Sequence, residues 1–149
     1  MIKLDQALAN VTKIGFDTPP IIYFIEAHPQ YDALVTDVFQ RIAKASLKGY
    51  TSVITLSEVL IQPLRRSNVY LQQSYRQILT RTFNFQTLPI NITIAEYAAD
   101  LRARYNLRTP DALQIAAALS VGCEALLTND SMLQRVTELR VLTLDELEL

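Results

Sequence analysis

The stretch Thr109-Pro110-Asp111-Ala112-Leu113-Gln114-Ile115-Ala116-Ala117-Ala118-Leu119 predicts a helix at the centre of the molecule. Thr109 is a suitable N-cap, and Pro110 suits the first helical position because its missing N–H would be unpaired there anyway. From Ala112 onward the segment is apolar on nearly every face, and such a helix is buried in the interior. Asp111 is therefore a carboxylate at the start of a buried helix.

The segments around this helix alternate between short β-branched runs and longer helical periods. Strands are predicted at residues 13–16, 50–54, 85–90, 124–127 and 140–142. Apolar residues at three- and four-residue spacing predict helices within residues 31–43, 57–61, 71–83 and 94–105. Strands that alternate with helices indicate an α/β fold, here a three-layer α/β/α sandwich with a central parallel sheet of four to five strands.

The length of 149 residues corresponds to one domain, spanning residues 1–149, at about 100–200 residues per domain. Residues 1–12 are expected to form a helical extension before the first strand. The N-terminus lacks the apolar run of a signal peptide, and the most apolar region, residues 112–127, is too interrupted to span a membrane. With a single cysteine as well, a cytoplasmic protein is expected.

Scarcity of three residue types excludes several classes of function. The chain has three glycines, one histidine and one cysteine. Gly15, Gly49 and Gly122 are too far apart for the Gly-rich loop of a P-loop NTPase or a dinucleotide-binding fold. One histidine and one cysteine cannot form a zinc cluster or a disulfide framework. A site for phosphate or metal must therefore be built from carboxylates.

Four carboxylates fall where predicted strands pass into helices or loops, namely Asp17, Glu58, Asp111 and Asp130. Because ligands bind beyond the carboxyl ends of the strands in such sheets, the four side chains could converge there. Each also has a purely structural explanation, such as a favourable charge at a helix N-terminus or a turn. For Glu58 the alternative is a capping box that begins at Thr55.

Four motifs, in this order along the chain, together resemble those of PIN domains. They are Phe16-Asp17-Thr18-Pro19-Pro20-Ile21-Ile22-Tyr23-Phe24-Ile25-Glu26, Val53-Ile54-Thr55-Leu56-Ser57-Glu58-Val59, the helix at residues 109–119, and Leu126-Leu127-Thr128-Asn129-Asp130. Three features depart from the family pattern. A helical segment precedes the first strand, no further acid follows in Ser131-Met132-Leu133, and Gln114 stands where a histidine is frequent.

The resemblance implies a ribonuclease that depends on Mg²⁺ or Mn²⁺, and many members are VapC-like toxins of toxin–antitoxin pairs. Carried over by position, Asp17, Glu58, Asp111 and Asp130 are the expected metal-binding and catalytic residues. RNA as substrate, an antitoxin protein as partner and a homodimer are expected on the same ground. Cations bound by oxygen ligands neutralise phosphate charge and lower the pKa of water, which allows water to attack the phosphodiester in line.

Five other residues are candidates for contacts with the substrate: Thr18, Thr128, Asn129, Arg65 and Arg66. The net charge of −1 conceals an uneven distribution, since residues 40–109 carry +7 and the rest of the chain −8. This asymmetry would allow a basic face that binds RNA beside an acidic metal pocket. Ordinary solvated helix faces remain the alternative explanation.

Two other functions compete with the nuclease interpretation. A non-catalytic PIN-like module that binds RNA or protein would keep the acids without turnover. A phosphoacceptor receiver or an aspartyl phosphatase is disfavoured, because the first strand is followed by Asp17-Thr18-Pro19 instead of Asp-x-Asp. No lysine follows Asp130, as a receiver would require near the end of a late strand.

Overall fold

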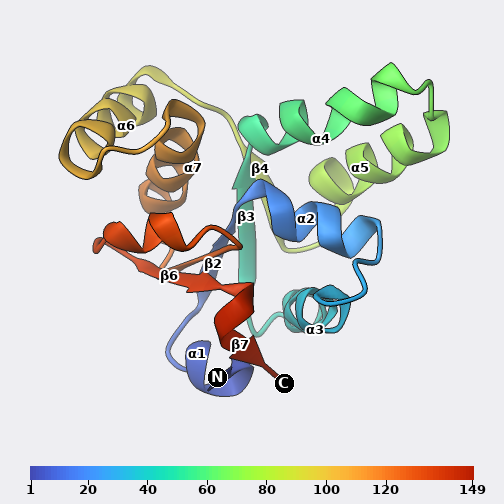
Figure 1. Ribbon diagram of the computed structural model, residues 1–149, viewed down its shortest axis with the longest axis horizontal. Helices are drawn as coiled ribbons and strands as arrows, with labels where there is room; N and C mark the ends of the chain where they lie inside the picture. The colour runs from blue at the N-terminus through green and yellow to red at the C-terminus, as the bar shows by residue number, and fades with distance from the viewer.

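The computed structural model describes all 149 residues, and at its centre is a five-stranded parallel sheet (Figure 1). The strands are β2 (Lys13–Phe16), β3 (Lys48–Ser52), β4 (Phe85–Leu88), β5 (Ala125–Thr128) and β6 (Arg140–Thr143). They lie in the order β4-β3-β2-β5-β6, and every neighbouring pair is parallel. The prediction of a parallel sheet is confirmed. Since β2 is the middle strand, its carboxyl end lies between those of β3 and β5.

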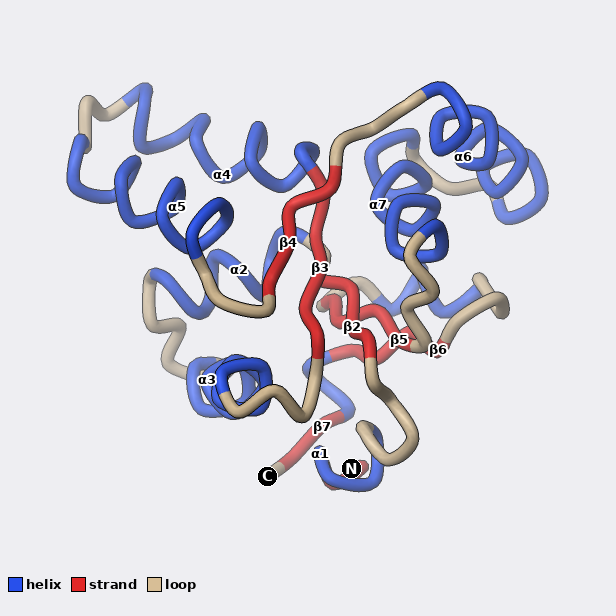
Figure 2. The backbone as a smooth tube through the Cα atoms, turned by 180° about the vertical axis from the view of Figure 1, so that it is seen from behind, coloured by secondary structure: helices blue, strands red, loops and turns tan.

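Helices cover both faces of the sheet. They are α1 (Leu4–Ala7), α2 (Thr18–Ile25), α3 (Asp32–Ala43), α4 (Val53–Arg65), α5 (Val69–Arg81), α6 (Ile92–Tyr105) and α7 (Thr109–Ser120), with 3-10 helices η1 (Ser131–Arg135) and η2 (Leu144–Glu146). One core cluster packs the five helices from α1 through α5 against one face of the sheet. A second core cluster packs α6 and α7 against the other face (Figures 1 and 2). Along β5, Leu127 belongs to the first cluster and Leu126 to the second, as the alternation of a strand requires. The three-layer α/β/α architecture is confirmed.

Helix α7 packs so closely on the sheet that the facing strand residue has no side chain. A Cβ added to Gly15 would lie 2.9 Å from Cβ of Ala118 and 3.2 Å from Cδ1 of Leu126. We expect Gly15→Ala to lower the free energy of unfolding by about 1–3 kcal/mol, as overpacking of a core does. In a urea-unfolding double-mutant cycle, Ala118→Gly should recover part of that loss. Strictly additive effects would contradict this contact.

The second strand is shifted from its predicted position. It ends at Ser52, and α4 begins at Val53, because the Ser52 hydroxyl accepts a hydrogen bond from the Ile54 N–H at 3.1 Å and caps the helix. Val53 and Ile54 are thus helical, although β-branched residues of this kind favour strands. The capping box proposed from Thr55 to Glu58 is wrong, since both residues lie inside α4.

Smaller differences occur at the chain start and at the end of the third predicted strand, β4. The helix expected over residues 1–12 is confined to Leu4–Ala7. Before it, β1 (Ile2–Lys3) pairs in parallel with β7 (Leu147–Glu148), beyond one end of the main sheet. Strand β4 ends before Pro89, which cannot donate a ladder hydrogen bond.

None of the helices is both long and apolar enough to cross a membrane.

Candidate active site

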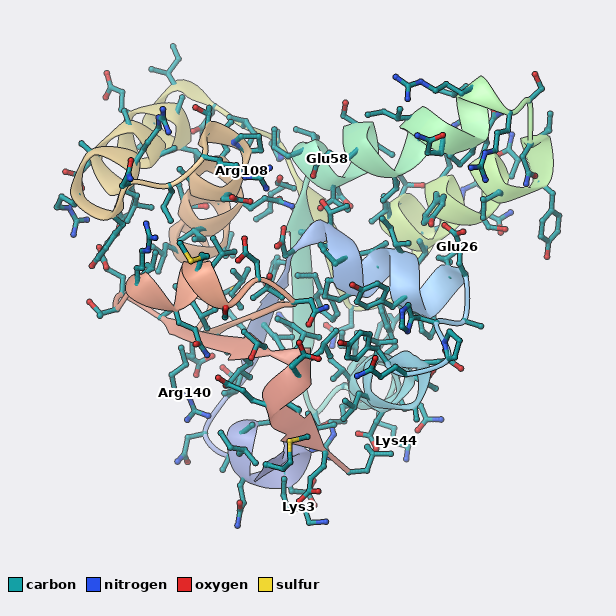
Figure 3. The ribbon with its side chains drawn as sticks, in the orientation of Figure 1. Lys3, Glu26, Lys44, Glu58, Arg108 and Arg140 are labelled. Atoms are coloured by element: carbon teal, nitrogen blue, oxygen red, sulfur yellow. The ribbon has the colours of Figure 1, made fainter.

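The four predicted acids line one pocket at the carboxyl edge of the sheet. Asp17 follows β2, Glu58 lies on α4, Asp111 in the first turn of α7, and Asp130 just after β5. The pocket has a volume of about 510 Å³. It is lined by Asp17, Thr18, Pro19, Ile22, Tyr23, Glu58, Ile61, Gln62, Arg108, Asp111, Asn129 and Asp130. Figure 3 shows Glu58 and Arg108 at the same end of the molecule, on α4 and at the start of α7.

Asp17 is the most constrained of these carboxylates. It is only 7% exposed and caps α2, where its Oδ1 accepts a hydrogen bond from the Thr18 N–H at 2.8 Å. Its Oδ2 accepts a second one from the Thr128 hydroxyl, also at 2.8 Å. Burial raises the pKa of Asp17, and the nearby Asp111 and Glu58 carboxylates add to the rise, against these two hydrogen bonds. A negative charge at this position is therefore incompletely compensated.

Glu58 is held by a network of buried hydroxyl groups beneath the pocket. The Thr18 hydroxyl donates to Oε1 of Glu58 at 2.6 Å and lies 3.0 Å from the Thr55 hydroxyl. Gln114 joins the network from α7: its Nε2 donates to the Thr55 hydroxyl at 2.6 Å, and its Oε1 accepts from the Ser52 hydroxyl. Side chains from α2, α4 and α7 thus fix the orientation of Glu58. Sequence reasoning noted Gln114 only as a departure from a family pattern.

Asp111 forms a two-pronged ion pair with Arg108. Nε of Arg108 donates to Oδ2 of Asp111 at 3.0 Å, and Nη2 of Arg108 donates to Oδ1 of Asp111 at 3.3 Å. The Asp111 side chain is 10% exposed and that of Arg108 is 76% exposed. The hydrogen bonds to Asp111 raise the pKa of Arg108. Sequence reasoning missed this contact, although a spacing of three residues at a helix start was the available signal.

The segment after β5 supplies the last wall of the pocket. Oδ1 of Asp130 accepts a hydrogen bond from the Met132 N–H at 2.9 Å and so caps η1. Nδ2 of Asn129 donates to the Tyr23 hydroxyl at 3.1 Å, whereas its Oδ1 is buried with no hydrogen-bond partner. Asn129 therefore presents an unsatisfied oxygen among the residues that line the pocket.

The predicted substrate contacts occupy different positions. Asn129 lines the pocket, but Thr128 is fully buried and binds Asp17 instead of facing a substrate. Thr18 lines the pocket while its hydroxyl is engaged with Glu58. Arg65 and Arg66 lie at the far end of α4 and do not line the pocket. Arg108 is the only basic residue that does.

The donor set suits a hard divalent cation, although the present geometry does not surround one. Carboxylate, hydroxyl and amide oxygens line the pocket, and these are the ligand types that Mg²⁺ and Mn²⁺ bind. The incompletely compensated charge of Asp17 would be stabilised by a cation. No three acidic, histidine or cysteine side chains surround a common point, however. Both oxygens of Asp111 are bound by Arg108.

The fold and the pocket define a class of protein: a three-layer α/β/α domain with an acidic site at the carboxyl edge of its parallel sheet. The model of the PIN domain family matches residues 14–139. The chain belongs to the PIN domain family. The matched region contains all four acids and the whole pocket.

Several solved structures share this fold. VapBC2 from Rickettsia felis, bound to a DNA fragment from its promoter, superposes with a TM-score of 0.71 at 18% identity, over 89% of this chain and 98% of that one. A toxin–antitoxin complex from Klebsiella pneumoniae gives 0.67 at 24% identity, over 88% and 97%. VapC20 from Mycobacterium tuberculosis, a toxin that cleaves the sarcin–ricin loop, gives 0.65 at 17% identity, over 85% and 98%. No curated protein matches the sequence significantly.

Proposed function

We propose that this protein is an endoribonuclease that depends on a divalent cation and is the toxin of a toxin–antitoxin pair. The observation that carries the proposal is the convergence of Asp17, Glu58, Asp111 and Asp130 on one pocket at the carboxyl edge of the sheet. Membership of the PIN family supports a nuclease, and the fold shared with a toxin that cleaves the sarcin–ricin loop supports RNA as the substrate. One catalytic unit would span residues 1–149.

The carboxylates Asp17, Glu58, Asp111 and Asp130 would hold one or two Mg²⁺ or Mn²⁺ ions. A bound cation neutralises the charge on phosphate and lowers the pKa of water. Two of the acids are already oriented by their neighbours, since Thr128 and the Thr18 N–H fix Asp17, and the Thr18 hydroxyl fixes Glu58. Because these contacts already fix both side chains, little reorganisation of Asp17 and Glu58 would be needed to bind a cation.

The partners proposed for this protein follow from the solved structures with the same fold. Two of these are complexes of a toxin with its antitoxin, and one of them includes promoter DNA. We infer an antitoxin protein and a homodimer for this chain as well, acting in the cytoplasm, where RNA is available. Arg65 and Arg66, exposed at the end of α4, would contact the RNA strand beyond the pocket.

The experiment that tests the nuclease proposal is cleavage of single-stranded RNA by the purified protein at increasing Mg²⁺ or Mn²⁺. We expect cleavage to require the cation, to stop on addition of EDTA and to return when the cation is restored in excess. Asp17→Asn, purified in the same way, controls for contaminating nucleases and should be inactive. RNA binding without cleavage in any divalent cation would contradict the nuclease and favour a non-catalytic binding module.

A further inference from the structure

Arg108 is the only cation among the twelve residues that line the acidic pocket. Its guanidinium binds both oxygens of Asp111 and has no other hydrogen-bond partner. Burial is uneven across this pair, because the carboxylate is almost covered while the arginine side chain is 76% exposed. Asp111 is thus fixed in the pocket wall, and Arg108 reaches it from the solvent side.

A divalent cation bound at Asp111 would compete with Arg108 for the same two oxygen atoms. A forked guanidinium–carboxylate pair uses the lone pairs of both oxygens that point toward the arginine. A cation at Asp111 would also repel the guanidinium. Since Arg108 precedes the first residue of α7 in an extended conformation and its side chain is largely solvated, it can leave without disturbing the helix.

The released guanidinium would remain at the rim of the pocket that receives the substrate. Arginine binds phosphate in the same forked geometry that it uses for carboxylate. No other basic residue lines the pocket, and the remaining charges there are the four carboxylates. Without Arg108, the phosphate group of RNA would meet no positively charged side chain in this pocket.

We propose that Arg108 is a positioning residue with two alternative partners: it neutralises Asp111 in the metal-free protein and binds a phosphate of the RNA once a divalent cation occupies Asp111. This inference rests on the proposed function and adds a role for a residue outside the four acids. It predicts a signature that structural damage would not produce, because removal of Arg108 should make the cation bind more tightly.

The first test measures Mn²⁺ binding in the absence of RNA, by electron paramagnetic resonance of the free ion. Arg108→Gln should bind Mn²⁺ about fivefold more tightly than wild type. An ion pair made by an exposed arginine contributes little free energy, so its removal should change the Mn²⁺ affinity by only a modest factor. Arg108→Lys, which keeps the charge but loses the fork, should fall between the two. Arg104→Gln is the matched control, because Arg104 pairs with Asp100 and Glu138 away from the pocket and should leave Mn²⁺ affinity unchanged.

The second test separates KM from kcat for RNA cleavage at saturating Mn²⁺. Arg108→Gln should raise KM for RNA about tenfold or more, as loss of a forked phosphate contact does. Tighter Mn²⁺ binding with an unchanged KM would overturn the phosphate role. A wild type that binds Mn²⁺ while Arg108→Gln binds it no more tightly would overturn the competition alone. A wild type that binds no Mn²⁺ would overturn the proposed function, and this inference with it.

Discussion

At pH 7, Asp17→Asn is expected to cleave RNA at least about a hundredfold more slowly than wild type, yet to unfold at a higher temperature. Loss of a residue that merely orients a metal ligand costs about 10–100-fold in affinity or activity, so loss of a ligand should cost at least as much. The gain in stability follows from burial, because Asp17 is 7% exposed and faces Asp111 and Glu58. The amide is uncharged; its Oδ1 can still accept from the Thr18 N–H, and its Nδ2 can donate to the Thr128 hydroxyl oxygen once that hydrogen bond is reversed.

The stability difference should depend on pH with a defined sign. In the folded protein the pKa of Asp17 is raised above its ordinary value of 3.8, so the folded state holds this proton more tightly than the unfolded state does. Wild type therefore loses stability as pH rises from 3.8 through the raised pKa. Thermal unfolding of both proteins in EDTA, from about pH 3 upward, should show curves that converge at low pH and separate toward neutral pH.

A surface carboxylate provides the control for Asp17. Asp100 lies on α6 in an exposed ion pair with Arg104, and such pairs contribute about 0–1 kcal/mol. Asp100→Asn should therefore change neither cleavage nor the pH dependence of unfolding appreciably. An Asp17→Asn protein that retains wild-type cleavage would contradict the assignment of Asp17 to the active site. One that is less stable than wild type at pH 7 would contradict the electrostatic account.

Gln114→Leu is expected to lower the free energy of unfolding by about 2–4 kcal/mol, because it leaves buried hydroxyl groups without partners. Gln114 is 4% exposed and bridges the hydroxyls of Ser52 and Thr55, which are themselves fully buried. For a chain of this length the melting temperature should fall by roughly 10 °C. Cleavage should fall as well, since the same network orients Glu58 through Thr18.

An exposed glutamine provides the matched control for Gln114. Gln73 lies exposed on α5, and Gln73→Leu makes the same chemical change where no buried group loses a partner. Its melting temperature should stay within a few degrees of wild type. If Gln114→Leu were as stable as wild type, the hydroxyl groups would have found other partners. The network would then not be what holds Glu58.

The arrangement of the sheet could be predicted because each strand has a strong local signal and parallel topology leaves few alternatives. The carboxyl ends of parallel strands meet at one edge, so the positions of Asp17 and Asp130 after their strands were sufficient to bring them together. The end of β3 could not be located in the same way. Val53 and Ile54 have strong strand propensity, and the cap at Ser52, which depends on the turn geometry, overrides it.

The partners of the acids were harder to predict than the acids themselves. Among ten basic residues between positions 40 and 109, the sequence does not distinguish Arg108 from Arg65 and Arg66. The difference arises from packing, because Arg108 directly precedes a helix whose N-terminus faces the pocket, whereas α4 carries the other two away from it. The network around Gln114 likewise joins residues from three separate segments of the chain, at Thr18, at Ser52 and Thr55, and at Gln114.

The hydrogen bond from Thr128 to Asp17 spans 111 positions of sequence, so the pocket cannot be completed during synthesis before residue 128 has been made. The middle strand β2 gains its neighbour β5 only after residues 125–128 have left the ribosome. Contacts of such long range form late, because loop closure must precede them. A nascent chain that ends at α6 lacks Asp111 and Asp130. It also lacks Thr128, whose hydroxyl donates to Asp17. For a protein proposed to cut RNA, the message and the ribosome that produce it are thereby spared until residues 111–130 have been synthesised.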